Sequence, residues 1–171
     1  MQKVLGFLGI ALLFGACQLY NDALKPDRIE ERYIQATRKG ELLNGLKTEA
    51  IIVATHLNGF DSEHFKHEEG ELFFIDIYLS DTSLERKDRG LYNPLYSVRL
   101  SNGATPLEIT QLEKSDLLRY NITFASRWGE YFLVRFPVQT RRYLEEMSLE
   151  IVHENLGIAT LDYGFKVMKK K

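Results

Sequence analysis

From Thr48 towards the C-terminus, apolar and polar residues alternate in short runs, and turn residues separate one run from the next. A period of two places successive side chains on opposite faces of a β-strand. The runs are rich in Ile, Val, Phe, Tyr and Thr, which favour strands. The pattern predicts about eight strands, at residues 48–57, 71–80, 95–101, 104–112, 117–126, 130–138, 148–154 and 158–166.

The alternation also indicates which side chains face the interior. Three of the predicted strands carry an alternating apolar set: Phe73, Ile75, Ile77 and Leu79; Leu118, Tyr120, Ile122 and Phe124; and Phe132, Val134, Phe136 and Val138. The opposite faces carry Asp76, Tyr78, Tyr131 and Arg135. We therefore expect each strand to turn one face to a hydrophobic core and the other to solvent.

Turn signals connect these strands. Asn102-Gly103 is the strongest, because both residues accept the positive φ that a type I′ hairpin turn needs, and Trp128-Gly129 and Asn155-Leu156-Gly157 are similar. Short strands joined by tight turns, with no helical pattern between them, are typical of antiparallel folds. The sequence predicts a mainly β protein, an antiparallel β-sandwich, with a barrel as the alternative.

A helical period precedes the strands. Asp27 suits the N-cap of a helix, Glu30 three positions later completes a capping box, and Gly40 is a suitable end. The apolar stripe of this helix consists of Ile29, Tyr33 and Ala36. We expect one N-terminal helix whose stripe packs on the sandwich.

The composition fits a globular protein. The chain has 171 residues, with 10 Phe, 9 Tyr and 27% charged residues, and its formal net charge is −2. This balance gives no basic field for nucleic acid. The chain has only 1 Cys, so the predicted sandwich depends on packing rather than on disulfide bonds.

The single cysteine closes a distinctive N-terminal segment. Lys3 provides a positive charge, an apolar run extends over residues 4–14, and the small residues Gly15 and Ala16 precede Cys17. The run is shorter than the roughly 20 residues of a membrane-spanning helix. The segment resembles the export signal of bacterial lipoproteins, although Phe14 stands where Leu is usual. The alternative is an ordinary secretory signal in which Cys17 has no role.

The resemblance implies a membrane-anchored protein of the cell envelope. Residues 1–16 would be the signal peptide, acylated Cys17 would insert in membrane lipid, and residues 17–26 would form a tether. Residues 27–171 would form one periplasm-facing domain. Gln18 is not the Asp that retains many lipoproteins in the inner membrane, so the resemblance favours the outer membrane in a cell with two membranes.

Candidate chemistry is sparse. His64 and His67 lie in a polar loop with Asp61, Glu63 and Glu68, and His56 is just upstream. Imidazole and carboxylate groups suit zinc-type metals, so His56, His64 and His67 are the candidate ligands of a metal- or small-ligand-binding module. The alternative, which we favour, is a solvated connector without metal or other cofactor.

The sequence predicts no enzyme. It contains no Gly-x-Ser-x-Gly motif, and His153 lies in a strand pattern, where we expect it to pack. The mixed-sign loop at residues 81–90 is expected to be a solvated connector. Trp128 lies at a predicted hairpin tip, where it could form an interaction surface or cover the end of the core. We expect a non-enzymatic scaffold or interaction module that binds an envelope protein.

Overall fold

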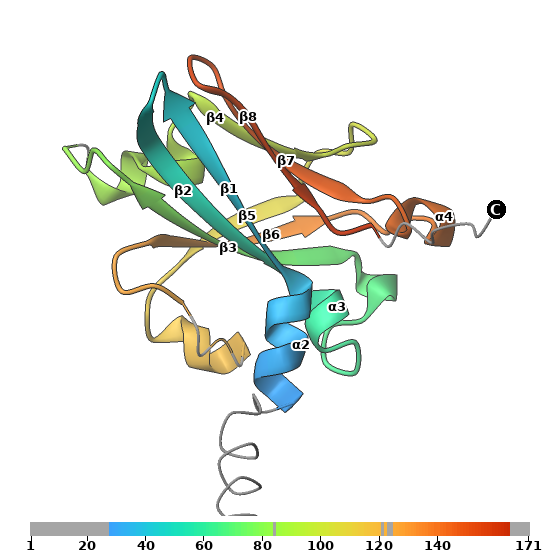
Figure 1. Ribbon diagram of the computed structural model, residues 1–171. Coiled ribbons are helices and arrows are strands. Elements are labelled where there is room, and N and C mark those ends of the chain that lie inside the picture. Colours follow the sequence, from blue (N-terminus) through green and yellow to red (C-terminus); the bar gives the residue numbers. More distant parts are fainter. Residues whose placement is uncertain (1–27, 84, 121, 123–124, 165–171) are drawn as a thin grey trace, which may run out of the picture. The chain divides into compact units, whose positions relative to one another are not determined.

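The computed structural model describes residues 28–83, 85–120, 122 and 125–164 (Figure 1). The chain divides into two compact units, residues 1–32 and 33–171. Only residues 28–32 of the first unit are described, so Cys17 and the predicted signal and tether lie outside the described residues. None of the helices in the described part combines the length and apolar composition that a membrane span requires.

The mainly β, antiparallel architecture is confirmed. Eight strands form a five-stranded sheet in the order β1-β2-β3-β6-β5 and a three-stranded sheet in the order β4-β7-β8 (Figure 1). The strands are β1 (Thr37–Asn44), β2 (Lys47–His56), β3 (Glu71–Leu79), β4 (Tyr96–Leu100), β5 (Glu108–Leu112), β6 (Glu130–Phe136), β7 (Ser148–His153) and β8 (Gly157–Asp162). The described α-helices are α2 (Arg28–Ala36), α3 (Leu57–Phe60) and α4 (Arg141–Leu144). The 3₁₀ turns are η1 (His67–Glu69), η2 (Arg86–Asp88), η3 (Gly90–Tyr92) and η4 (Asp116–Tyr120).

The N-terminal helix ends earlier than predicted. Helix α2 stops at Ala36, and Thr37 begins β1, which pairs with β2 from Thr37 opposite Thr55. The two threonine hydroxyls are 2.8 Å apart in a hydrogen bond. Gly40 lies inside β1 rather than at a helix end, and a Cβ there would be 3.3 Å from the Cβ of Ala159 in β8. Gly40 therefore lets β1, an edge strand of the five-stranded sheet, lie close to β8, an edge strand of the three-stranded sheet.

One predicted strand is wrong. Residues 116–120 form the 3₁₀ turn η4 instead of a strand at 117–126. The backbone N–H of Glu113 donates to Asp116 Oδ2 at 2.8 Å, and such local bonding competes with strand pairing. The predicted inward set divides accordingly: Ile122 is buried, whereas Leu118 is 75% exposed. Phe124 lies outside the described residues.

The predicted turns have different outcomes. The turn at residues 155–157 joins β7 to β8, with Gly157 at φ +92°. The turn at residues 102–103 forms, with Gly103 at φ +86°, but it leads from β4 in one sheet to β5 in the other. Strand β5 begins only at Glu108, because Pro106 has no N–H to offer a ladder. Residues 128–129 lead into β6 without a paired strand before them.

Two hydrophobic cores stabilise the five-stranded sheet. The first lies between the sheets, which is the arrangement of a β-sandwich, and includes Phe73, Phe132 and Phe136 with Leu100 and Ile151 of the second sheet. The second core lies on the other face of the five-stranded sheet and comprises Tyr33, Ala36, Leu57, Phe60, Phe65, Phe74, Leu112, Leu117, Ile122, Tyr131 and Leu133.

The second core corrects the expected face assignment. Asp76 and Tyr131, expected to meet solvent, are each only 4% exposed. Val138, expected to face inward, lies beyond the end of β6 and is 58% exposed. Part of the five-stranded sheet is thus buried on both faces, and only Tyr78 on the outward set of β3 keeps substantial exposure.

Side chains cover the free edge of β5. The Tyr92 hydroxyl donates to the carbonyl oxygen of Ile109 at 3.3 Å and accepts from the backbone N–H of Gln111 at 3.1 Å. The Arg86 guanidinium donates to the carbonyl oxygen of Leu112 at 3.1 Å. Polar backbone groups on this edge are therefore satisfied from the preceding loop.

Candidate functional site

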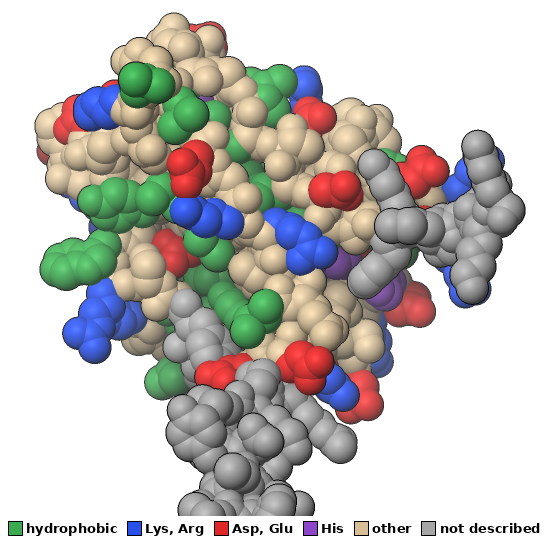
Figure 2. All heavy atoms as spheres, viewed as in Figure 1, with side chains coloured by type: hydrophobic (Ala, Val, Ile, Leu, Met, Phe, Trp, Pro, Cys, Tyr) green, Lys and Arg blue, Asp and Glu red, His purple; other side chains and the backbone are tan. Residues whose placement is uncertain are grey.

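Trp128 is presented to solvent beside an apolar groove. Its side chain is 81% exposed, so it does not cover the end of the core. The groove has a volume of about 300 Å³ and is lined by Trp128, Ser126, Asp76, Tyr78, Ile51 and Val53. These residues come from the turn before β6 and from the outer face of β2 and β3. Apolar side chains project at the left of the view in Figure 2, on the side where β3 ends and β6 begins in Figure 1.

The turn that carries Trp128 is fastened to the sheet by a buried carboxylate. Asp76 Oδ2 accepts the backbone N–H of Ser126 at 2.7 Å, and Oδ1 accepts its hydroxyl at 3.2 Å. The hydroxyl of Tyr131 donates to the carbonyl oxygen of Ser126. A Cβ at Gly129 would be 1.6 Å from Asp76 Oδ1, so only glycine fits there. Hydrogen bonds at Ser126 therefore hold the start of the turn, and Gly129 lets its end pass close to Asp76.

Burial of the Asp76 carboxylate, which fastens the Trp128 turn, is energetically unfavourable. Its burial raises the pKa, and the hydrogen bonds from Ser126 only partly oppose that effect. Within the part of the chain that the structure describes, the ion pairs are all made by other carboxylates, and none joins Asp76 to a basic side chain. A charge buried without a cation costs free energy, and the two hydrogen bonds from Ser126 offset part of that cost.

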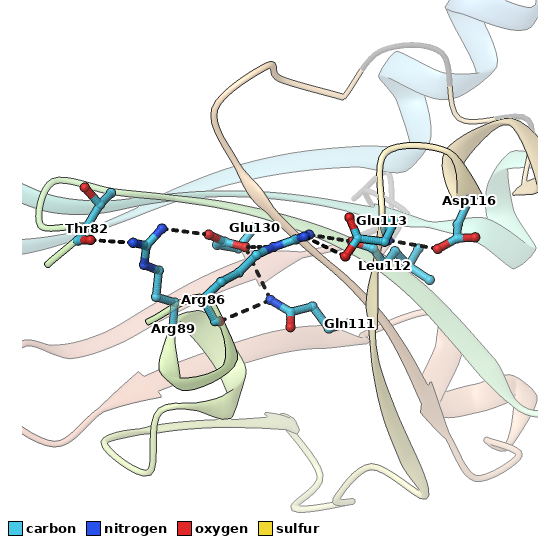
Figure 3. Close-up of polar contacts among 8 residues, drawn as sticks. All are labelled: Thr82, Arg86, Arg89, Gln111, Leu112, Glu113, Asp116 and Glu130. Carbon is cyan, nitrogen blue, oxygen red and sulfur yellow. Dashed lines mark hydrogen bonds and ion pairs between the residues drawn. The ribbon is translucent and has the colours of Figure 1, made fainter. Parts of the chain in front are cut away.

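The loop at residues 81–90 connects β3 to β4, and most of its described residues are exposed, as expected of a solvated connector, but ion pairs also tie it to the start of β6 (Figure 3). Arg86 Nε lies 3.1 Å from Glu130 Oε2, and Arg86 Nη1 lies 2.6 Å from Glu113 Oε1. Arg89 Nη1 lies 3.3 Å from Glu130 Oε1. Glu130 is the first residue of β6 and follows Gly129, so the same strand end receives both the charged loop and the Trp128 turn.

A second cluster contains two of the three predicted histidines. Glu71 Oε2 lies 2.7 Å from His56 Nε2, and Glu71 Oε1 lies 2.9 Å from His67 Nδ1. One potential ligand atom from each of these three side chains lies within 4.8 Å of the other two. His64 is exposed and packs edge-on against Phe65, so it is not part of the cluster.

Sequence reasoning missed Glu71, although a signal was present. Glu71 begins β3 and shares the phase of Phe73, Ile75 and Ile77, the set that faces the inter-sheet core. An acidic residue in phase with a buried apolar row requires a partner. The strand pairing supplies it, because His56 at the end of β2 is opposite Phe73 and therefore close to Glu71.

The surroundings hold this cluster in place. Glu71 is fully buried, and the His56 ring stacks on Phe73 with centroids 4.9 Å apart and meets Tyr163 edge-on at 5.9 Å. Burial opposes ionisation of Glu71, but the hydrogen bonds and charges of His56 and His67 outweigh it, and the pKa of Glu71 is lowered. The His67 side chain is 41% exposed, and histidine side chains reach the surface at the right of Figure 2.

His153 packs in its strand. Its ring meets Tyr96 edge-on with centroids 4.6 Å apart, and Nδ1 accepts the backbone N–H of Asn155 at 3.2 Å. These contacts give the side chain a structural place in the β4–β7 pair.

The comparisons with known proteins give no relative. No family model matches the chain, and the comparisons with curated proteins and with solved structures found no match either. The candidate sites therefore rest on their own geometry.

Proposed function

We propose that this chain is a lipid-anchored protein of the cell envelope that acts without catalysis and binds another envelope protein through the Trp128 turn. The observation that carries the proposal is a tryptophan that is 81% exposed beside an apolar groove, on a turn that hydrogen bonds with Asp76 and Tyr131 fasten to the sheet. Tryptophan is enriched among the residues that dominate binding energy. Hydrogen bonds at Ser126 hold the backbone of the turn, so ordering that backbone costs less conformational entropy when a partner binds.

The groove favours a particular kind of partner. Ile51, Val53 and Tyr78 offer apolar contact beside Trp128, whereas Asp76 is only 4% exposed and both of its carboxylate oxygens accept hydrogen bonds from Ser126. A partner protein segment that presents an apolar or aromatic side chain would complement this groove. We therefore expect a protein segment of this chemistry, rather than lipid or a second copy of the chain, as the occupant.

The proposed lipid anchor at Cys17 has its own test. Cys17→Ser should release the protein from the membrane fraction, because the acyl chains that hold it require the thiol. Membrane fractionation, with mass spectrometry of the N-terminal peptide of the wild type, measures this. An unmodified Cys17, or a wild type recovered entirely in the soluble fraction, would contradict the lipoprotein proposal while leaving the Trp128 surface open to its separate test.

The interaction is tested by photo-crosslinking in the full-length protein in its native membrane. A photoreactive phenylalanine analogue at position 128 should give one discrete adduct with another protein. The adduct should disappear when Tyr78→Asp places a charge in the groove, a change that the 45% exposure of Tyr78 makes tolerable for the fold. Thermal unfolding of each variant checks that the fold is retained.

A matched control uses Leu107, which is 68% exposed and lies at the opposite end of β6 from Trp128. The same analogue at position 107 should give no such adduct. The proposal fails if both positions capture the same protein, or if Tyr78→Asp leaves capture at position 128 unchanged. An adduct with the mass of two chains, or with lipid alone, would also overturn it.

A further inference from the structure

We infer that His56, His67 and Glu71 form a binding site for one divalent transition-metal ion of the zinc type. The inference is independent of the Trp128 surface, because it rests on different residues at a different part of the sandwich. The three side chains come from the end of β2, from the turn η1 and from the start of β3. The β2–β3 pairing thus brings together residues that the intervening loop separates in sequence.

The ligand set has the right chemistry. Two imidazoles and one carboxylate bind zinc and related first-row metals well, whereas calcium and magnesium prefer oxygen ligands. Three protein ligands leave at least one coordination position for water or another molecule, as in zinc sites that are not purely structural. Because His67 is 41% exposed on its side chain, an ion can reach the cluster from solvent.

The spacing requires only small movements. Zinc lies about 2.0–2.2 Å from nitrogen and oxygen ligands, so ligand atoms around one ion are about 3.3–3.5 Å apart. Here the carboxylate oxygens lie 2.7 Å and 2.9 Å from the two ring nitrogens. An ion would separate each oxygen–nitrogen pair by about 0.4–0.8 Å and replace two direct hydrogen bonds. It would also bring the two ring nitrogens, which lie within 4.8 Å of each other, to the same spacing.

The binding step balances in protons. In the metal-free arrangement His56 Nε2 and His67 Nδ1 lie within hydrogen-bond distance of the Glu71 carboxylate. An ionised carboxylate only accepts, so each ring nitrogen would carry the proton of its hydrogen bond. To bind an ion, each neutral ring presents the lone pair of that nitrogen and carries its proton on the other nitrogen. A ring that is protonated first releases one proton to solvent. No oxidant or other reactant is needed.

Burial of the cluster favours binding over a purely structural role. Glu71 is fully buried in the apolar row of β3, where a hydrophobic residue would satisfy the core without a desolvation penalty. The His56 ring is held by stacking on Phe73 and by its hydrogen bond to Glu71. Two ligands are therefore held before an ion arrives, and only His67 must adjust.

The test measures zinc binding by the metal-depleted full-length protein in detergent. Titration with Zn²⁺ against a competing zinc-binding dye should give one ion per chain, and Co²⁺ should give visible absorption bands that report its coordination. Glu71→Gln and His67→Ala should each weaken the affinity by about tenfold or more. Zinc should also raise the Tm of the wild type, and this shift should be lost in both variants.

His64→Ala is the matched control, because His64 lies three residues from His67 in the same loop but outside the cluster. It should bind Zn²⁺ like the wild type. If Glu71→Gln disturbs folding, His67→Ala still decides, since that side chain is partly exposed. The inference is overturned if the wild type binds no Zn²⁺ at micromolar free ion. It is also overturned if His67→Ala binds as the wild type does, or if His64→Ala loses binding.

Discussion

Replacing Phe136 with alanine is expected to lower the free energy of unfolding by about 3–5 kcal/mol. Phe136 is fully buried at the end of β6 and packs edge-on against Phe73, with ring centroids 5.7 Å apart. Both rings belong to the core between the two sheets, so neither sheet can close the cavity alone. Chemical denaturation of the wild type and Phe136→Ala, followed by far-ultraviolet circular dichroism, measures the difference.

Val138→Ala provides the control for this cavity. Val138 is two residues further along the chain, but it is 58% exposed. Its truncation should change the free energy of unfolding by less than about 0.5 kcal/mol. Similar losses at both positions would mean that the core does not end with β6 as described.

Gly70→Ala is expected to destabilise the protein by about 2–5 kcal/mol, through backbone strain and overpacking together. Gly70 has a φ of +106°, which L-residues rarely adopt, and a Cβ there would be 2.3 Å from the carbonyl oxygen of Phe136. That oxygen belongs to the backbone and cannot rotate away. Thermal and chemical unfolding measure the loss, and movement of the neighbouring Glu71 should also weaken zinc binding.

Gly103→Ala separates the two causes. Gly103 also has a positive φ, +86°, but no atom lies within 4 Å of the position its Cβ would take. This variant should show strain alone, a loss of about 1 kcal/mol. If both alanine variants lose the same stability, close contact with the Phe136 backbone is not what requires glycine at position 70.

Alternation identified most strands because burial of one face leaves a clear period in the sequence. It missed β1, an edge strand in which Leu42 is the one fully buried residue. It predicted a strand at residues 117–126, where local hydrogen bonding by Asp116 produces a 3₁₀ turn. Periodicity reports how residues are patterned and not whether a neighbouring strand exists to pair with them.

The same limit explains the outcome at the candidate sites. Residue type alone identified His56 and His67, whereas Glu71 required the β2–β3 register to be known. Asp76 was expected to face solvent, because an alternating pattern is interpreted as a sheet with one buried face and one solvent-exposed face. Segments distant in sequence, including Tyr33 and Leu117, build the second core on that face. The sequence identified Trp128 as a candidate interaction surface, but it did not identify Asp76, whose carboxylate fastens the Trp128 turn.

The covered edge of β5 has a consequence for crowding. An uncovered edge strand offers its N–H and C=O groups to a strand of another molecule and can begin polymerisation. Here the Tyr92 hydroxyl hydrogen-bonds to the carbonyl oxygen of Ile109 and to the backbone N–H of Gln111, and Arg86 donates to the carbonyl oxygen of Leu112. Molecules confined to a membrane surface collide far more often than molecules in bulk solution. In the membrane-anchored protein that we propose, the Tyr92 hydroxyl would protect neighbouring molecules from joining sheet to sheet through β5.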